Sequence, residues 1–140
     1  MEIRYKYKDP ETIADILRNC QTLAVVGLSS HKDRAGYYVP AYMQSKGYRI
    51  IPVNPHLSQA LGERAFPDLH SVPELVDLVL IFRRSEAVPP FVEHAIQIGA
   101  KAIWMQLGIV NPPAAQAAQQ AGLKVVMNAC IMVEHRRWAA

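Results

Sequence analysis

The stretch that most constrains the fold of this chain is the apolar run 23–26, Leu-Ala-Val-Val, which ends at Gly27. A short, wholly apolar run of this kind is typical of a strand buried on both faces of a parallel sheet. The polar loop that follows carries hydroxyl and cationic side chains at Ser29, Ser30, Lys32 and Arg34. A helical pattern begins a few residues later. Free backbone N–H groups and the positive end of a helix dipole meet in such a loop, so the sequence predicts a binding site for phosphate.

Further apolar runs alternate with helical patterns along the rest of the chain. We predict strands at residues 49–54, 75–82, 101–107 and 123–128. Helices are expected at residues 9–20, 39–46, 86–98 and 111–121. This alternation indicates an α/β fold with a doubly wound, Rossmann-like parallel sheet and helices on both faces, in three α/β/α layers.

The expected strand order is 3-2-1-4-5-6, with a vestigial third strand near Ala65 and Phe66. Pro52 conflicts with this order, because a proline cannot donate to a strand ladder and normally marks an edge. We expect residues 1–140 to form one domain, with an N-terminal arm and helix at 1–20 and a C-terminal tail at 129–140. Basic and aromatic residues alternate over 4–8, and we expect an exposed arm there rather than a nucleic-acid-binding strand.

In a doubly wound sheet the ligand lies across the carboxyl ends of the strands, at the point where the strand order reverses. Four strand ends of this chain would meet there. The residues that we expect to bind a cofactor are Gly27, Leu28, Ser29, Ser30, Lys32, Arg34, Val53, Asn54, Pro55, Phe82, Arg83, Arg84, Gln106 and Gly108.

Composition restricts the classes of function. The chain has 15 Lys and Arg against 12 Asp and Glu, a balance that suits an anionic ligand but is too mild to indicate nucleic acid. It has no run of about 18 apolar residues and no signal-peptide pattern, so we expect a cytoplasmic protein without a membrane partner. Cys20 and Cys130 form no CxxC pair, and the five histidines have no metal-ligand spacing, so no metal site is expected.

The loop after the first strand does not match the common nucleotide motifs. Where the NAD fingerprint has its second and third glycines, this chain has Ser29 and Lys32, and the second strand ends in Asn54 rather than an acidic residue. The chain also lacks a Walker A loop. Instead, Arg34, Arg83 and other cations surround the predicted cleft, which favours a ligand with more phosphate charge than NAD.

Five segments resemble a known family. They are Ala-Val-Val-Gly-Leu-Ser at 24–29, Ile-Ile-Pro-Val-Asn-Pro at 50–55, Phe-Arg-Arg-Ser-Glu-Ala-Val at 82–88, Gly-Ala-Lys-Ala-Ile-Trp-Met-Gln-Leu-Gly at 99–108, and Cys-Ile-Met-Val-Glu-His-Arg at 130–136. In these segments the chain resembles the small stand-alone bacterial CoA-binding proteins, which are similar to the CoA-binding domain of the succinyl-CoA synthetase α subunit. They span nearly the whole chain beyond residue 20.

The resemblance implies that the ligand is coenzyme A or a short acyl-CoA. It implies that the diphosphate lies over the Gly27 loop, the adenosine beside Pro55, and residues 82–84 along the opposite wall. Asn128 departs from the family, whose members often have Asp there. The synthetase's second domain, with its phosphorylated histidine, has no counterpart in this chain, so the resemblance does not carry over ligase activity.

The sequence identifies no catalytic residues. Cys130 is the best candidate nucleophile, but on a helix the side chain of His135 would be turned by about 140° from that of Cys130. Cys20 and Trp104 are expected in the core.

We therefore expect a CoA-binding sensor or carrier module without catalysis of its own. One alternative is an enzyme dependent on NADP or another phospho-nucleotide, in which Arg34 or Arg83 binds the 2′-phosphate. Another is a CoA-binding subunit of a separate acyl-CoA ligase. A second copy of the chain or a ligase protein is left open as a partner.

Overall fold

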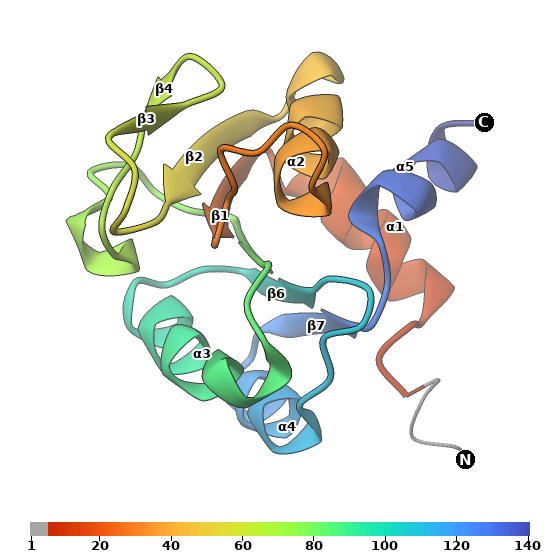
Figure 1. Ribbon diagram of the computed structural model, residues 1–140. Helices are drawn as coiled ribbons and strands as arrows, with labels where there is room; N and C mark the ends of the chain where they lie inside the picture. The colour runs from red at the N-terminus through yellow and green to blue at the C-terminus, as the bar shows by residue number, and fades with distance from the viewer. Residues whose placement is uncertain (1–5) are drawn as a thin grey trace.

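The computed structural model describes residues 6–140 and arranges them as a parallel sheet between two layers of helices (Figure 1). The strands of the main sheet are β1 (Thr22–Val26), β2 (Arg49–Val53), β5 (Leu78–Ile81), β6 (Ala102–Met105) and β7 (Lys124–Met127). The helices are α1 (Pro10–Asn19), α2 (Ala35–Ser45), α3 (Val88–Gln97), α4 (Pro112–Gln120) and α5 (Ile131–Ala139). The chain also forms the β3 (Gln59–Ala60) and β4 (Glu63–Arg64) hairpin and the short 3-10 helices η2 (Leu69–Ser71) and η3 (Ser85–Ala87).

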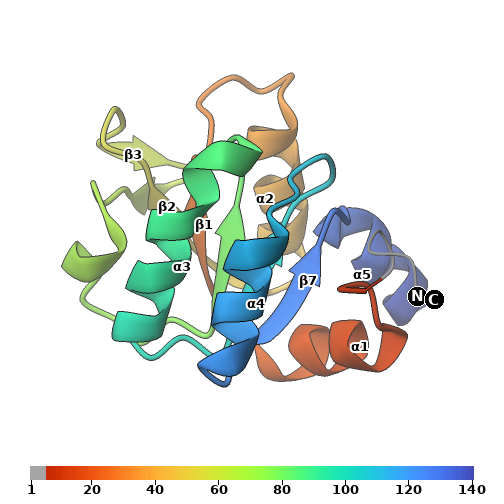
Figure 2. The ribbon, with the colours of Figure 1, turned by 90° about the horizontal axis from the view of Figure 1, so that it is seen from below.

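The main sheet has the order β2-β1-β5-β6-β7, and all of its pairs are parallel. Helices α3 and α4 cover one face, while α1, α2 and α5 cover the other (Figure 2). Each face has its own apolar cluster, because every strand is buried on both sides. The predicted doubly wound, three-layered α/β fold is therefore confirmed.

Phe66 supplies the vestigial third strand. It forms an isolated parallel bridge with Val53, donating its N–H to the Pro52 carbonyl and accepting from the N–H of Asn54, each at 2.9 Å. Toward β1, the ladder instead uses Arg49, which donates to Gln21, and Val53, which accepts from Gly27. The missing N–H of Pro52 thus faces the outer side of β2, and the apparent conflict with the predicted strand order disappears.

Local sequence signals place the ends of several helices. Asp9 caps α1 by accepting a hydrogen bond from the N–H of Thr12 at 3.0 Å, and Asn111 caps α4 by accepting from the N–H of Ala114 at 3.1 Å. Trp104 is fully buried and donates its Nε1–H to the Ala129 carbonyl at 2.8 Å. Asp9 and Asn111 stand at the predicted starts of their helices, and the predicted core position of Trp104 is confirmed.

The exposed N-terminal arm was expected over residues 4–8. Residues 4 and 5 lie outside the described part of the chain, but the expectation is wrong for Tyr7, which is only 4% exposed and belongs to the core. Its carbonyl accepts a hydrogen bond from the N–H of Met127 at 2.9 Å. The aromatic ring favours burial, and β7 offers it an open edge, so this segment packs onto the sheet.

The strand predicted at residues 75–82 is shorter in the structure, where Leu75 is 88% exposed and Asp77 precedes β5. The Asp77 carboxylate accepts from the N–H groups of Gln21 and Thr22 at 2.9 and 3.0 Å, and it pairs with Lys101 at 3.3 Å. Asp77 therefore joins the beginnings of β1, β5 and β6. Burial raises the pKa of its carboxyl, but the two N–H donors and Lys101 outweigh burial, and the net pKa lies below its usual value.

Replacing Asp77 with alanine is expected to lower the free energy of unfolding at pH 7 by about 2–4 kcal/mol, because two backbone donors lose a charged acceptor. Since the folded pKa is depressed, this stabilisation is present above the unfolded pKa of about 3.9 and is lost as pH falls through the folded value. Urea unfolding of both proteins at pH 7 and near pH 3 measures this, with the exposed Asp33→Ala as control. An equal deficit of the Asp77 variant at both pH values would contradict the assignment.

None of the helices in the described chain combines the length and apolar character that a membrane crossing requires.

Candidate functional site

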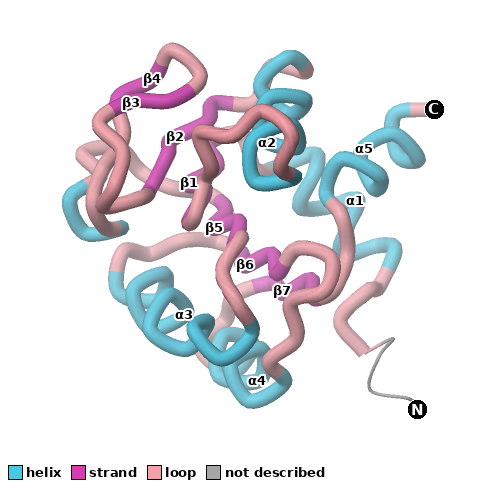
Figure 3. The backbone as a smooth tube through the Cα atoms, viewed as in Figure 1, coloured by secondary structure: helices cyan, strands magenta, loops and turns pink. Residues whose placement is uncertain are grey.

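A cleft of about 910 Å³ lies at the carboxyl ends of the strands. The loops that follow β1, β5 and β6 gather at this end of the sheet (Figure 3). A recess of about 310 Å³ adjoins the cleft on the side of β2 and shares Gly27, Asn54, His56 and Arg83 with it. The ligand site predicted at the reversal of strand order thus coincides with a real hollow.

Gly27 allows the loop after β1 to pass close to the end of β5. Its φ is 83°, in the left-handed region, and a Cβ placed there would stand 2.7 Å from the Phe82 carbonyl oxygen and 3.0 Å from the side chain of Arg83. No other residue type fits both conditions, because a side chain would be strained by the φ angle and would collide with backbone. The glycine therefore keeps open the floor shared by the cleft and the recess.

The first turn of α2 provides free backbone donors beside this loop. Arg34 is the N-cap residue but makes no side-chain capping bond, and the first turn has no acidic residue. The N–H of Ser29 donates to the Gly36 carbonyl at 3.0 Å, which ties the loop to the helix. Within the described chain, the N–H groups of Ala35 and Gly36 donate to no protein acceptor. They line the cleft and are suited to an anion.

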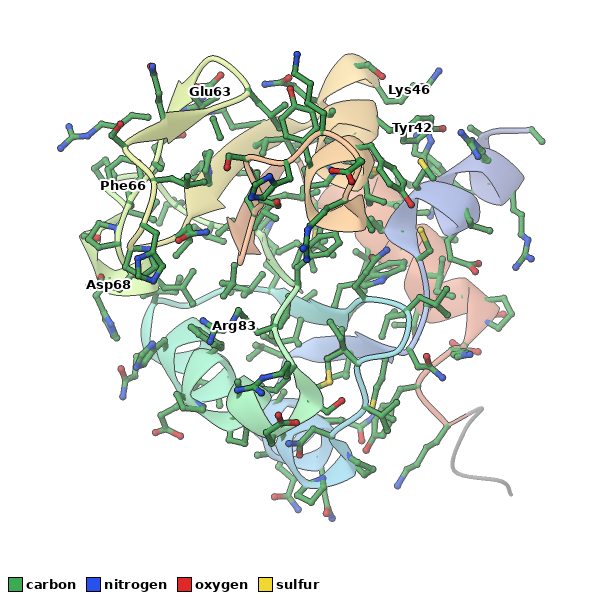
Figure 4. All side chains as sticks on the ribbon, in the orientation of Figure 1. Tyr42, Lys46, Glu63, Phe66, Asp68 and Arg83 are labelled. Atoms are coloured by element: carbon green, nitrogen blue, oxygen red, sulfur yellow. The ribbon has the colours of Figure 1, made fainter. Side chains whose placement is uncertain are left out.

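The charge of the cleft is one-sided. Arg34, Arg83 and Arg84 line it, and among residues 6–140 no lining residue of the cleft or the recess is acidic. Arg84 pairs with Glu86 at 3.3 Å, but both side chains are largely exposed and the pair is weak. Arg83 extends from the loop between β5 and α3 (Figure 4), with its guanidinium 5.6 Å from the centre of the Phe91 ring.

The side chain of Asn54 is engaged within the protein. Its Nδ2 donates to the Leu28 carbonyl at 2.9 Å, and its Oδ1 accepts from the N–H of His56 at 2.8 Å. Asn54 thus connects the end of β2 to the Gly27 loop. An acidic residue at this position would hold a ribose hydroxyl in an NAD site, whereas this amide shapes the loops around the hollow.

Most of the predicted binding residues come together. The cleft is lined by Gly27, Leu28, Ser29, Ser30, Arg34, Asn54, Phe82, Arg83, Arg84 and Gln106. Val53 and Pro55 line the recess. Lys32 and Gly108 line neither. Gly108 instead donates its N–H to Oδ1 of Asn128 at 2.8 Å, so Asn128 holds the loop after β6.

Sequence reasoning missed several lining residues, including His31, Gly36, His56 and Ile109. Gly36 carried a usable signal, because glycine is a poor helix former and stands here in the first turn of α2. A Cβ at Gly36 would lie 3.4 Å from the Gly27 carbonyl oxygen, at the near limit of ordinary van der Waals contact, so the helix and the loop leave little space here for a larger side chain. Ile109 carried no signal, since an apolar residue close to a strand end is usually interpreted as core.

His135 does not pair with Cys130, the candidate nucleophile, but with a tyrosine. That histidine is buried, and its Nδ1 lies 2.8 Å from the Tyr42 hydroxyl. Burial, with a smaller contribution from Lys46, lowers its pKa. Cys130 is the N-cap residue of α5. Cys20 is a core residue, and burial raises its pKa to about 11.

The family model that describes the CoA binding domain matches residues 21–136 of this sequence. The chain belongs to this CoA-binding domain family. The predicted resemblance to small CoA-binding proteins is therefore confirmed. An uncharacterized protein of Bacillus subtilis, YneT, is 42% identical over 123 residues, which cover 88% of this chain and 91% of that protein.

Solved structures and longer relatives agree with this membership. A hypothetical protein from Pyrococcus horikoshii superposes with a TM-score of 0.90 at 34% identity, covering 94% of this chain and 93% of that one. An ADP-forming acetate–CoA ligase of Archaeoglobus fulgidus is 26% identical over 83 residues, which are 58% of this chain but only 12% of the ligase. The family thus includes stand-alone chains and is related to segments of large CoA ligases.

Proposed function

We propose that this chain binds coenzyme A or a short acyl-CoA in the cleft, as a sensor or carrier module without catalysis of its own. The observation that carries the proposal is the convergence of free N–H donors of α2 and three arginines on a cleft that has no acidic lining residue in the described part of the chain. The diphosphate lies over the Gly27 loop and the start of α2. The adenosine lies toward Pro55 in the adjoining recess. The third phosphate of CoA agrees with the excess of arginines.

Calorimetric titration of ligand-stripped protein tests this proposal, with CoA, 3′-dephospho-CoA, NAD and NADP as ligands. We expect CoA to bind, and its affinity to fall about tenfold or more without the 3′-phosphate, because one charge-assisted contact is lost. NAD and NADP should bind more weakly than CoA. Binding of NADP without binding of CoA would reject the proposal and favour the alternative of a phospho-nucleotide enzyme.

A second candidate function is that the chain supplies the CoA site to a separate acyl-CoA ligase. Two observations favour it: the match to a short segment of a much longer ligase, and the exposure of Leu107 and Val110, at 65% and 39%, in the loop after β6 beside the cleft. Recovery of a ligase protein with the tagged chain, together with acyl-CoA synthesis by the mixture alone, would support this candidate.

A further inference from the structure

Gln106 is a buried polar side chain just beyond β6, with only 4% of its surface exposed. Its Oε1 accepts a hydrogen bond from the N–H of Ile131, at the start of α5, at 3.2 Å. This bond fixes the orientation of the amide, since the N–H of Ile131 requires an acceptor. The Nε2 group then carries two donor hydrogens, and it has no hydrogen-bond partner among residues 6–140.

The free Nε2 group opens onto the cleft. In the described chain, the side-chain polar atom that is both fully enclosed and unpaired is Nδ1 of His94, so Nε2 of Gln106 is not sealed within the core. Gln106 lines the cleft together with Leu107 and Ile109. An unpaired donor in such a place is costly, and an acceptor on a bound ligand would satisfy it.

The position of this donor along the cleft follows from the strand order. Strand β5 lies between β1 and β6, and neighbouring strands are about 4.8 Å apart, so Gln106 is roughly 10 Å from the Gly27 loop across the sheet. The nearby side chains of Leu107 and Ile109 are apolar. The part of the ligand at this end therefore presents apolar groups to Leu107 and Ile109 and a hydrogen-bond acceptor to Gln106.

Building on the proposed CoA-binding function, we infer that Gln106 recognises the pantetheine arm by donating from Nε2 to the carbonyl of its β-alanyl unit. That carbonyl carbon is about nine bonds from the nearer phosphorus, or roughly 11 Å in an extended chain. The methylene groups of the arm pack on Leu107 and Ile109. An acyl thioester carbonyl is about five bonds further along, beyond Gln106. This residue thus selects for the arm and is indifferent to the acyl group.

The test compares CoA, acetyl-CoA and 3′-phospho-ADP, which has the same phosphates but no pantetheine arm. Gln106→Glu keeps an acceptor for the N–H of Ile131 and removes the donor. Gln106→Met removes the donor without adding charge, and thermal unfolding checks that each variant folds. Titration of 3′-phospho-ADP measures any general effect of the added charge or of local repacking.

In both variants we expect the ratio of CoA affinity to 3′-phospho-ADP affinity to fall about tenfold, with acetyl-CoA weakened by the same factor as CoA. A ratio unchanged in a folded variant would overturn the inference while leaving CoA binding intact. Weakening confined to acetyl-CoA would overturn it as well, since the contact would then be to the thioester. Failure of the wild-type protein to bind CoA would reject the proposed function itself.

Discussion

Replacing Gly27 with alanine is expected to abolish CoA binding and to lower the free energy of unfolding by about 2–4 kcal/mol. The φ of 83° alone costs a residue with a side chain about 1–2 kcal/mol. The remainder comes from the Phe82 carbonyl oxygen, 2.7 Å from the new Cβ, which moves only if the end of β5 moves. Chemical unfolding measures the stability, and titration with CoA measures binding.

Gly99→Ala is the matched control. Its φ is 77°, but no atom of residues 6–140 lies within 4 Å of the position of a Cβ, so this variant bears only the conformational cost. We expect it to lose about 1–2 kcal/mol and to bind CoA as the wild type does. Equal stability of the two variants, with CoA binding intact in both, would show that the close approach of Gly27 to β5 contributes neither to stability nor to CoA binding.

Removing two of the cleft's arginines together, by Arg34→Gln and Arg83→Gln, is expected to weaken CoA binding at least 100-fold. Each charge-assisted contact to phosphate contributes about 1.5–3 kcal/mol, and the two side chains reach the cleft from different loops. Little stability should be lost, because both residues are exposed. Titration at low and high salt should also show that the wild type loses affinity with salt more steeply than the double variant.

The control for this experiment is Arg18→Gln with Arg137→Gln, which makes the same change in net charge on α1 and α5, away from the cleft. It should bind CoA nearly as the wild type does. If the two double variants lose affinity equally, the arginines act only through the overall charge of the protein, and the proposed phosphate contacts are wrong.

The fold was predictable because its signals are local and repeated. Each strand is an apolar run, each helix carries a stripe or a cap, and the alternation of the two implies a parallel sheet. The errors occurred where a residue's role depends on a distant partner. Leu75 to Asp77 look like strand, yet Asp77 is fixed by the backbone of Gln21 and Thr22, more than fifty positions away. Tyr7 looks exposed, yet β7 offers it an edge.

For the site, strand ends could be predicted but side-chain partners could not. The sequence placed Gln106 and Asn54 at the same cleft because parallel strands end at the same edge. It gave no means to distinguish them: the amide of Asn54 is bound at both ends within the protein, whereas that of Gln106 is bound only through its oxygen. That difference depends on the loop after β1 and on the start of α5, which the local pattern around either residue does not reveal.

Both borders of the main sheet are partly occupied by other segments of the chain. At β2, the bridge to Phe66 occupies the outer donor and acceptor positions, and Pro52 offers no N–H there. At β7, the N–H of Met127 is taken by the Tyr7 carbonyl. Exposed sheet edges are the usual template for aggregation and for assembly through shared strands. Because these positions are occupied, we expect a stable assembly of this protein, with itself or with a ligase, to form mainly through helix or loop surfaces, such as the loops around the cleft.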